Sequence, residues 1–449
     1  ISYYLDSGKL EEAEARTKAI LEKNGKDLSG RFFDARIRLA KGNADEAISL
    51  LQGVVKDEPQ LAVAHYFLGV AFMHKRQTVQ ARGAFTESVK LNPNLPEPRT
   101  ALAAIHLDEG SLDLAIEQAQ AAIQLNPRNV QAAIISGDAY LRKGDFAKSK
   151  QVFGAVAQAL PKEAVGPYRL GLVARAEKND AKALTYFEDA LSKKPTAIEP
   201  LAHIATIKIA QGKANEARER VNTQLVASPN NPQLYNLLGQ LWIQANDTGQ
   251  AETAFKKALE LDNSLLSAYM NLGMVYQMAG KTDQAAKEFE AVLAKDPKVI
   301  QAHMVLGIIH DARNEYDKAQ THYEAILKLD PRFAPAANNL AWIEVEQGRN
   351  LDIALSHAQT AREQQPNDSH IADTLGWVYY KKNANLLAMN LLKEAVEQLP
   401  DDPVVHFHYG MAQQKNGDQA GAKKSLQTAL KLSQTFTGSE EAKKTLAGL

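Results

Sequence analysis

The sequence predicts an all-α protein built as a solenoid of repeated helical hairpins. Three features predict it: prolines recurring every 34 residues, small residues in register with them, and glycine or asparagine between helix-length segments. A proline ends one helix and turns the chain toward the next, because its ring fixes φ and it lacks an N–H. The recurring residues are Pro59, Pro93, Pro127, Pro161, Pro195, Pro229, then Asn263, Pro297 and Pro331, with Pro366 after 35 residues and Pro400 after 34.

This spacing divides the chain into three parts. Residues 1–27 are a partial repeat, in which ISYYLDSG is the tail of one helix and residues 9–24 form its partner. Residues 28–433 are twelve repeats, and we expect them to form one continuous superhelix, because stacked repeats share a core with their neighbours. They begin at Leu28, Ala62, Pro96, Val130, Ala164, Ile198, Pro232, Leu266, Ile300, Ala334, Ser369 and Pro403. Residues 434–449 are expected to form a capping helix over the last repeat. The chain begins at Ile1, partway through a repeat, so we expect a fragment or a processed form.

Within each repeat, small residues mark the places where two helices approach closely. At position 8 they are Ala35, Gly69, Ala103, Gly137, Gly171, Ala205, Gly239, Gly273, Gly307, Ala341, Gly376 and Gly410. An alanine at position 20 recurs in the second helix, with Ser149 as the one exception. Glycine or asparagine between the helices is typical of a left-handed helix end, and only Arg76 and Lys178 depart from it.

Residues 266–299 carry the full pattern. Its marked residues are Tyr269, Leu272, Gly273, Tyr276, Ala285, Phe289 and Pro297. This pattern resembles the tetratricopeptide repeat, a helix–turn–helix unit of 34 residues. The resemblance implies a right-handed superhelix in which the first (A) helix of each repeat lines a concave face. The extra residue within 347–352 predicts a longer turn between two helices; a local change in superhelical pitch is the alternative.

Composition excludes several classes of protein. Basic and acidic residues number 52 and 53, so the net charge of −1 does not favour nucleic acid or an anionic membrane as a partner. No apolar run is long enough to span a bilayer. The absence of cysteine excludes disulfides, thiolate metal sites and cysteine nucleophiles, but it does not fix the compartment.

Catalytic and cofactor motifs are not evident. Gly280-Lys281-Thr282 resembles the end of a phosphate-binding loop, but the expected spacing and the preceding strand are missing. His303, His310 and His406 occupy aromatic slots of the repeat, which favours packing over metal binding. We therefore expect no enzyme activity, no metal and no cofactor.

The resemblance implies that positions 2, 5, 9, 12 and 13 of each repeat point into the concave groove. In the second half of the chain these positions collect methionines, aromatic residues and amides. Methionine is adaptable and tryptophan is a large anchor, so they suit an extended or helical peptide. The predicted partner-binding residues are Asn236, Gln240, Met270, Met274, Gln277, Met278, Met304, Ile308, Asp311, Asn338, Trp342, Asp373, Trp377, Tyr380, Phe407 and Met411. The alternative is that these side chains, the tryptophans above all, pack between repeats as core; Trp242 occupies a core slot.

Segments in the C-terminal quarter of the chain resemble a more specific group of proteins within the repeat family. The segments NNLAW, GRNLD and DTLGW within residues 336–383, and the closing EEAKKTLAGL, are similar to bacterial tetratricopeptide-repeat lipoproteins of exopolysaccharide and PEP-CTERM export systems. This likeness implies a scaffold on the outer side of the inner membrane, periplasmic or membrane-associated, with any lipid anchor upstream of Ile1. The alternative function is a regulatory, substrate-recruiting arm of a larger enzyme such as a glycosyltransferase. The oligomeric state and the partner are not indicated.

Overall fold

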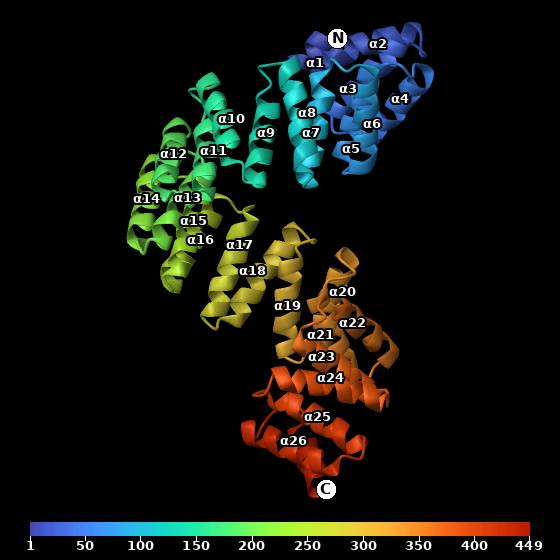
Figure 1. The fold of residues 1–449 in the computed structure, drawn as a ribbon, viewed down its shortest axis with the longest axis vertical. Helices are drawn as coiled ribbons and strands as arrows, with labels where there is room; N and C mark the ends of the chain where they lie inside the picture. Colours follow the sequence, from blue (N-terminus) through green and yellow to red (C-terminus); the bar gives the residue numbers. More distant parts are fainter. The chain divides into compact units, whose positions relative to one another are not determined.

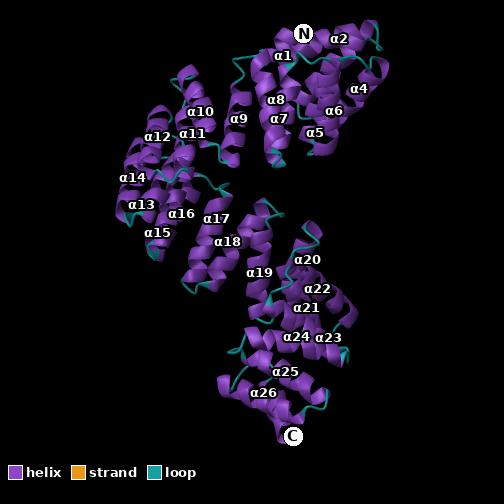
Figure 2. Cartoon of the chain, viewed as in Figure 1, coloured by secondary structure: helices purple, strands orange, loops and turns teal.

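A computed structural model describes every residue, Ile1–Leu449, and confirms the all-α prediction: the chain folds into 27 helices and no strand (Figure 2). The helices are α1 (Ser2–Asp6), α2 (Leu10–Lys23), α3 (Leu28–Ala40), α4 (Ala44–Asp57), α5 (Ala62–His74), α6 (Thr78–Leu91), α7 (Pro96–Asp108), α8 (Leu112–Leu125), α9 (Val130–Lys143), α10 (Phe146–Ala159), α11 (Val165–Ala176), α12 (Asp180–Lys193), α13 (Ile198–Ala210), α14 (Ala214–Ala227), α15 (Pro232–Gln244), α16 (Thr248–Leu261), α17 (Leu266–Met278), α18 (Thr282–Lys295), α19 (Ile300–Ala312), α20 (Tyr316–Leu329), α21 (Ala334–Glu346), α22 (Leu351–Gln364), α23 (Ser369–Lys381), α24 (Asn385–Gln398), α25 (Pro403–Lys415), α26 (Gln419–Leu432) and α27 (Ser439–Ala447).

These helices form two compact units, each a stack of helical hairpins (Figure 1). Unit 1 is Ile1–Ser228 and contains α1 to α14, and unit 2 is Pro229–Leu449 and contains α15 to α27. Within each unit the second (B) helix of a hairpin also packs against the A helix of the next hairpin. A single superhelix across residues 28–433 stays a prediction. The final helix, α27, packs against α26 and α25 and buries Ala442.

Every turn between an A and a B helix contains one residue with a left-handed backbone. Glycine or asparagine takes this position in ten of the twelve repeats, and Arg76 (φ 57°) and Lys178 (φ 59°) adopt it in the other two. Next to Arg76, the N–H of Gln77 donates to the carbonyl oxygen of Phe72 at 2.9 Å, and this bond caps the C-terminus of α5. The hairpin therefore dictates this backbone geometry even where the side chain disfavours it.

Small residues at position 8 allow the two helices of a repeat to cross. A Cβ added to Gly273 would lie 2.8 Å from the ring of Phe289, and one added to Gly69 would lie 2.5 Å from the ring of Phe85. Both rings are buried, so they have little room to move away. The glycine thus makes space for an aromatic side chain from the partner helix.

The extra residue lengthens one turn, as the first interpretation expects. Residues 347–350 separate α21 from α22, whereas two residues separate α9 from α10 and three separate the helices of the other hairpins. Asn350 caps α22 by accepting from the backbone N–H of Asp352 at 2.9 Å. Arg349 pairs with Asp317 of the preceding repeat at 2.6 Å, so the longer turn is tied to its neighbour.

Candidate partner-binding face

The structure separates the sixteen predicted partner-binding residues by exposure. The exposed ones are Gln240, Met274, Gln277, Met278 and Ile308. The half-buried ones are Asn236, Met270, Met304, Asp311, Asn338, Trp342 and Tyr380. The buried ones are Asp373, Trp377, Phe407 and Met411. All five exposed residues lie on α15, α17 and α19, and the four buried ones lie on α23 and α25.

Eight of the twelve exposed or half-buried residues form two rows across four successive A helices of unit 2. Position 5 carries Asn236, Met270, Met304 and Asn338 on α15, α17, α19 and α21, in that order. Position 9 carries Gln240, Met274, Ile308 and Trp342 on the same helices. Each row therefore has apolar side chains on α17 and α19 and a residue with hydrogen-bonding capacity on α15 and α21.

At the α15 end, neighbouring side chains hold the amide in place. The amide nitrogen of Asn271 donates to the carbonyl oxygen of Asn236 at 3.0 Å, and the amide nitrogen of Asn236 donates to the hydroxyl of Ser267 at 3.4 Å. These bonds join α15 to α17 and fix the orientation of the Asn236 amide.

Two polar side chains, Asp311 on α19 and Asn338 on α21, have oxygen atoms to which no protein group donates a hydrogen bond. The side-chain oxygen of Asn338 is buried and makes no hydrogen bond. Burial raises the pKa of Asp311 on α19, and this carboxyl has no ion-pair partner. A buried acceptor without a donor costs free energy, and this applies to the Asn338 oxygen, whereas the half-buried Asp311 carboxyl still meets solvent.

The prediction that Trp377 is an accessible anchor is wrong, and so is the same prediction for Asp373, Phe407 and Met411. His408 on α25 binds both carboxylate oxygens of Asp373 through Nδ1 at 2.9 Å and stacks on Trp377 with ring centres 4.0 Å apart. His408 therefore fills the space between α23 and α25 and buries both Asp373 and Trp377.

The C-terminal segment covers the adjoining surface. The ring of Phe436 lies 5.9 Å from that of Phe407, and a Cβ on Gly438 would lie 2.3 Å from the same ring. Met411 and Ala442 belong to the same core cluster. At this end of unit 2, the packing interpretation of the aromatic residues is correct.

Trp342 and Tyr380 lie at the boundary between core and surface. The ring of Trp342 is 5.7 Å from that of His408, while Tyr380 stacks on Trp377 with ring centres 4.6 Å apart. Lys415 places its ammonium 4.3 Å from the centre of the Tyr380 ring. Burial lowers the pKa of this lysine, and the charge of Lys381 lowers it further. Trp242, expected in the core, is half-buried against the cluster that contains Leu272.

The histidines of α19 pack as the repeat slots predict. Nδ1 of His303 lies 3.0 Å from Nδ1 of His322 on α20, and the rings of His310 and His322 stack with centres 5.6 Å apart. Nδ1 of His310 lies 2.7 Å from a carboxylate oxygen of Glu315. No group of three or more metal-binding side chains has the geometry to hold an ion.

A feature that sequence reasoning missed lies in unit 1. A cavity of about 810 Å³ opens between α8, α9 and α10. The sequence contains a signal for it, because Ala133 and Val152 occupy two facing slots and together are the smallest such pair among the twelve repeats. A smaller cavity of about 320 Å³ on the A-helix face includes Tyr66 and Ile135.

Comparison with known proteins identifies the repeats. Tetratricopeptide-repeat profiles match residues 1–62, 38–105, 100–164, 174–241 and 404–436, and a profile described as the Cytochrome c-type biogenesis protein H TPR domain matches residues 220–336. Together these matches cover well over half of the chain. The chain belongs to the tetratricopeptide-repeat family. None of its helices is long and apolar enough to cross a membrane.

Two curated relatives share part of the chain. It is 22% identical over 311 residues to Cellulose synthase operon protein C of Pseudomonas fluorescens (strain SBW25), covering 57% of this chain and 24% of that protein. It is 22% identical over 196 residues to Anaphase-promoting complex subunit 6 of Arabidopsis thaliana, covering 44% of this chain and 36% of that protein. The chain thus spans about a quarter and about a third of these relatives' lengths.

Solved structures are similar at low identity. The Cut9–Hcn1 hetero-tetramer of the APC/C matches with a TM-score of 0.43 and 13% identity, over 99% of this chain and 94% of that one. YrrB, described as a TPR protein with an unusual peptide-binding site, matches with a TM-score of 0.36 and 19% identity, over 43% and 99% of the two chains.

Proposed function

We propose that this tetratricopeptide-repeat chain is a non-catalytic scaffold that binds an extended peptide segment of a partner protein across α15, α17, α19 and α21. The observation that carries the proposal is the pair of rows with an apolar middle and polar ends. Met274, Met278 and Ile308 are 46%, 50% and 46% exposed, and they lie on neighbouring A helices.

The dimensions of the rows fit such a segment. Packed helices lie roughly 8–10 Å apart, so four of them span roughly 25–30 Å. An extended chain rises about 3.4 Å per residue, and about eight residues would therefore cross both rows. Apolar side chains of the partner would contact the methionines, which adapt their shape to what they bind.

Hydrogen bonds at the ends would fix the register of the segment. Gln240 and Asn236 offer both donors and acceptors on α15, and Asp311 on α19 offers carboxylate oxygens without an ion-pair partner. Backbone N–H groups of a peptide, or a basic side chain near Asp311, would satisfy those oxygens. This arrangement favours a partner with an apolar centre and an N–H-rich or basic end.

The test uses a random nonapeptide library displayed on phage, selected against the wild-type chain, with the resulting peptides measured by fluorescence polarisation. Replacing Met274, Met278 and Ile308 together by alanine should weaken binding by at least about tenfold, a free-energy change of about 1.4 kcal/mol. Alanine is the best helix former, so the fold should persist.

The matched control replaces Leu386 and Leu387, which are 72% and 50% exposed on the B helix α24, by alanine. This variant should bind as the wild type does. If the triple variant keeps its affinity and its helical circular dichroism, the A-helix face is not the binding site.

We further propose that the scaffold acts in assembly of an exopolysaccharide or in protein export, outside the bacterial inner membrane. Support comes from the similarity to Cellulose synthase operon protein C and from the profile of the cytochrome c biogenesis domain over residues 220–336. Fractionation of cells that make the native-length protein tests the compartment. Recovery in the periplasmic or membrane fraction supports this proposal, and recovery in the cytosol alone contradicts it.

A further inference from the structure

The cavity of unit 1 is lined by the B helices α8 and α10 and by the A helix α9 between them. It has a volume of about 810 Å³, which lies within the range of pockets that bind ligands. Its walls include Ile123 from α8, Val130 and Ala133 from α9, and Val152 and Val156 from α10. The cavity therefore has an apolar interior and does not involve the A-helix face of unit 2.

The cavity exists because two facing slots of the repeat hold small side chains. Position 4 of the A helix faces position 23 of the B helix: Arg99 bonds to Gln118 at 3.2 Å in one repeat, and His303 lies 3.0 Å from His322 in another. In the repeat from Val130 these positions are Ala133 and Val152. This is the smallest pair among the twelve repeats.

The backbone carbonyl of the proline that ends the preceding repeat also has no side-chain hydrogen-bond partner here. His65, Arg99, His303 and His406 at position 4 bond to the carbonyl oxygens of Pro59, Pro93, Pro297 and Pro400. The corresponding carbonyl in the repeat from Val130 is that of Pro127, which lines the cavity opposite the short side chain of Ala133.

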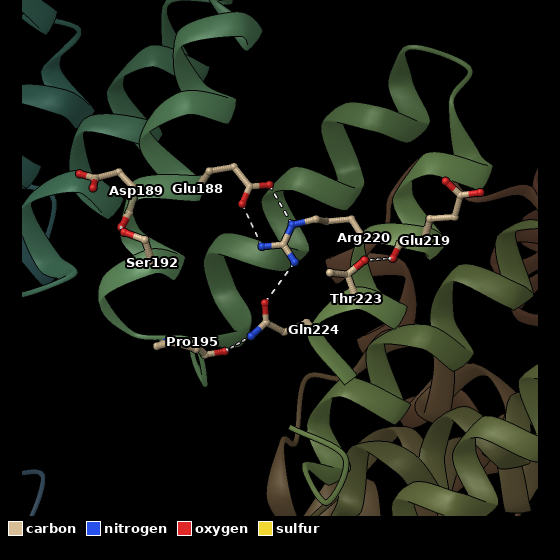
Figure 3. A network of polar contacts seen from close by, with 8 residues as sticks. All are labelled: Glu188, Asp189, Ser192, Pro195, Glu219, Arg220, Thr223 and Gln224. Atoms are coloured by element: carbon tan, nitrogen blue, oxygen red, sulfur yellow. Dashed lines mark hydrogen bonds and ion pairs between the residues drawn. The ribbon is translucent and has the colours of Figure 1, made fainter. Parts of the chain in front are cut away.

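Another repeat shows how the same space is filled. In the repeat from Ile198, Arg220 donates to both carboxylate oxygens of Glu188 at 2.9 and 2.8 Å and to Gln224 at 3.1 Å (Figure 3). Gln224 in turn donates to the carbonyl oxygen of Pro195 at 2.6 Å. The residues equivalent to Arg220 and Gln224 in the repeat from Val130 are Val152 and Val156, so the polar network is absent there and the space stays open.

The rim of the cavity has a distinct charge. Arg128 and Lys148 line it, and no acidic residue does. Arg128 makes no ion pair, while Lys148 lies 3.2 Å from Asp145 and 5.2 Å from the centre of the Tyr140 ring. A carboxylate is therefore favoured most at the Arg128 end.

Amide groups and a hydroxyl complete the lining. The side chain of Gln151 is exposed and makes no hydrogen bond within the protein, and Gln120 donates to the hydroxyl of Tyr140 at 2.8 Å, which leaves the Gln120 oxygen free to accept. Amides both donate and accept, as the backbone of a peptide does. An acyl chain would form no hydrogen bond with the Gln151 amide or with the Gln120 oxygen, whereas a peptide backbone would.

We propose that this cavity binds an extended segment of a partner protein with alternating apolar side chains and a carboxylate next to Arg128. The lining residues of α10 run from Lys148 to Ala159, about 17 Å along the helix axis at about 1.5 Å per residue. About five residues of an extended chain match that length. Alternate side chains of such a chain point to one side, toward Ala133 and Val152.

The test measures hexapeptides with Leu, Ile, Val or Phe at alternate positions and either Asp or Asn at one end. Wild-type chain should bind members of this set, and Asp peptides should bind at least about threefold more tightly than their Asn counterparts. Ala133→Tyr places in the slot the residue that Tyr235 and Tyr269 provide in other repeats. This variant should lose at least about tenfold in affinity.

Arg128→Gln is the second variant, because the Arg128 side chain is exposed and makes no hydrogen bond or ion pair within the fold, while its backbone bonds do not depend on the side chain. It should abolish the preference for Asp over Asn while apolar binding remains. The triple alanine variant of Met274, Met278 and Ile308 should bind these hexapeptides normally, so failure of the A-helix proposal and failure of this one are distinguishable.

Three outcomes overturn the inference. The first is that no hexapeptide of the set binds saturably. The second is that Ala133→Tyr binds as well as the wild type does. The third is that sodium decanoate binds in the cavity and Ala133→Tyr abolishes its binding, whereas the peptides do not bind; the occupant would then be an amphiphile.

Discussion

Protonation of His322 should make the α19–α20 hairpin less stable as the pH falls. This ring is half-buried, and burial lowers its pKa to about 4, with the charges of His303 and His310 adding to the effect. The unfolded chain would titrate near 6.5, the ordinary value. Between these two values the unfolded state binds a proton that the folded state does not, so stability is lost on going down from pH 6.5 to 4.

The size of the loss follows from the two pKa values. The difference between an ordinary pKa of 6.5 and one of about 4 corresponds to at most about 3 kcal/mol, at about 1.36 kcal/mol per pKa unit. Because solvent reaches part of the ring and screens its charge, we expect about 1–2 kcal/mol. Glu315 also lies in this hairpin, and its pKa is lowered mainly by Lys318 and further by His310. Its carboxylate therefore stays ionised over most of the range from pH 6.5 to 4.

Native-state hydrogen exchange of α19 and α20, corrected for the intrinsic effect of pH on exchange, measures this loss locally. Local measurement is needed because repeat arrays open in parts. His322→Gln removes the titrating group, and its hairpin should lose less stability between pH 6.5 and 4 than that of the wild type. An equal loss in both proteins would refute the reasoning, as would a pKa of His322 near 6.5 by NMR titration.

Three further changes test the packing of the repeats by urea unfolding. Arg76→Gly should stabilise the chain by about 0.5–1 kcal/mol, because glycine adopts the left-handed backbone without steric cost; no gain would mean that the arginine is not strained. Gly273→Ala should destabilise it by about 1–3 kcal/mol, because its Cβ meets the Phe289 ring, and adding Phe289→Leu should recover part of the loss. Asp373→Leu should cost about 2 kcal/mol, because buried His408 loses its hydrogen-bond partner; an unchanged midpoint would contradict the role of the pair.

The arrangement of helical hairpins could be predicted because the same physical requirements recur in every repeat. The turn geometry shows how strong they are, since Arg76 takes a backbone conformation that its side chain disfavours. Gly273 and Phe289 show that packing requirements are equally strong. The glycine has no side chain, so the Phe289 ring of the other helix can pack directly against its backbone. Such local rules need no knowledge of distant residues, so a single sequence reveals them.

The exposure of the candidate site could not be predicted in the same way. Position 9 is exposed at Met274 and Ile308 but buried at Trp377, although the repeat pattern is the same. The difference depends on what the next A helix offers: His408 stacks on Trp377 and binds Asp373. A position within a repeat fixes the direction of a side chain, whereas its burial is decided by residues about one repeat further along the chain.

The slots at positions 4 and 23 explain how one repeated fold acquires different local chemistry. In the repeat from Ile300 they hold His303 and His322, whose rings contact each other through their Nδ1 atoms. In the repeat from Ile198, Arg220 at position 23 organises a hydrogen-bond network with Glu188 and Gln224. In the repeat from Val130 the two slots hold alanine and valine, and the result is a cavity. None of these residues serves the crossing of the helices or the turn, so the fold tolerates all three. Variation at such slots changes what a repeat can bind while the hairpin that carries it stays the same.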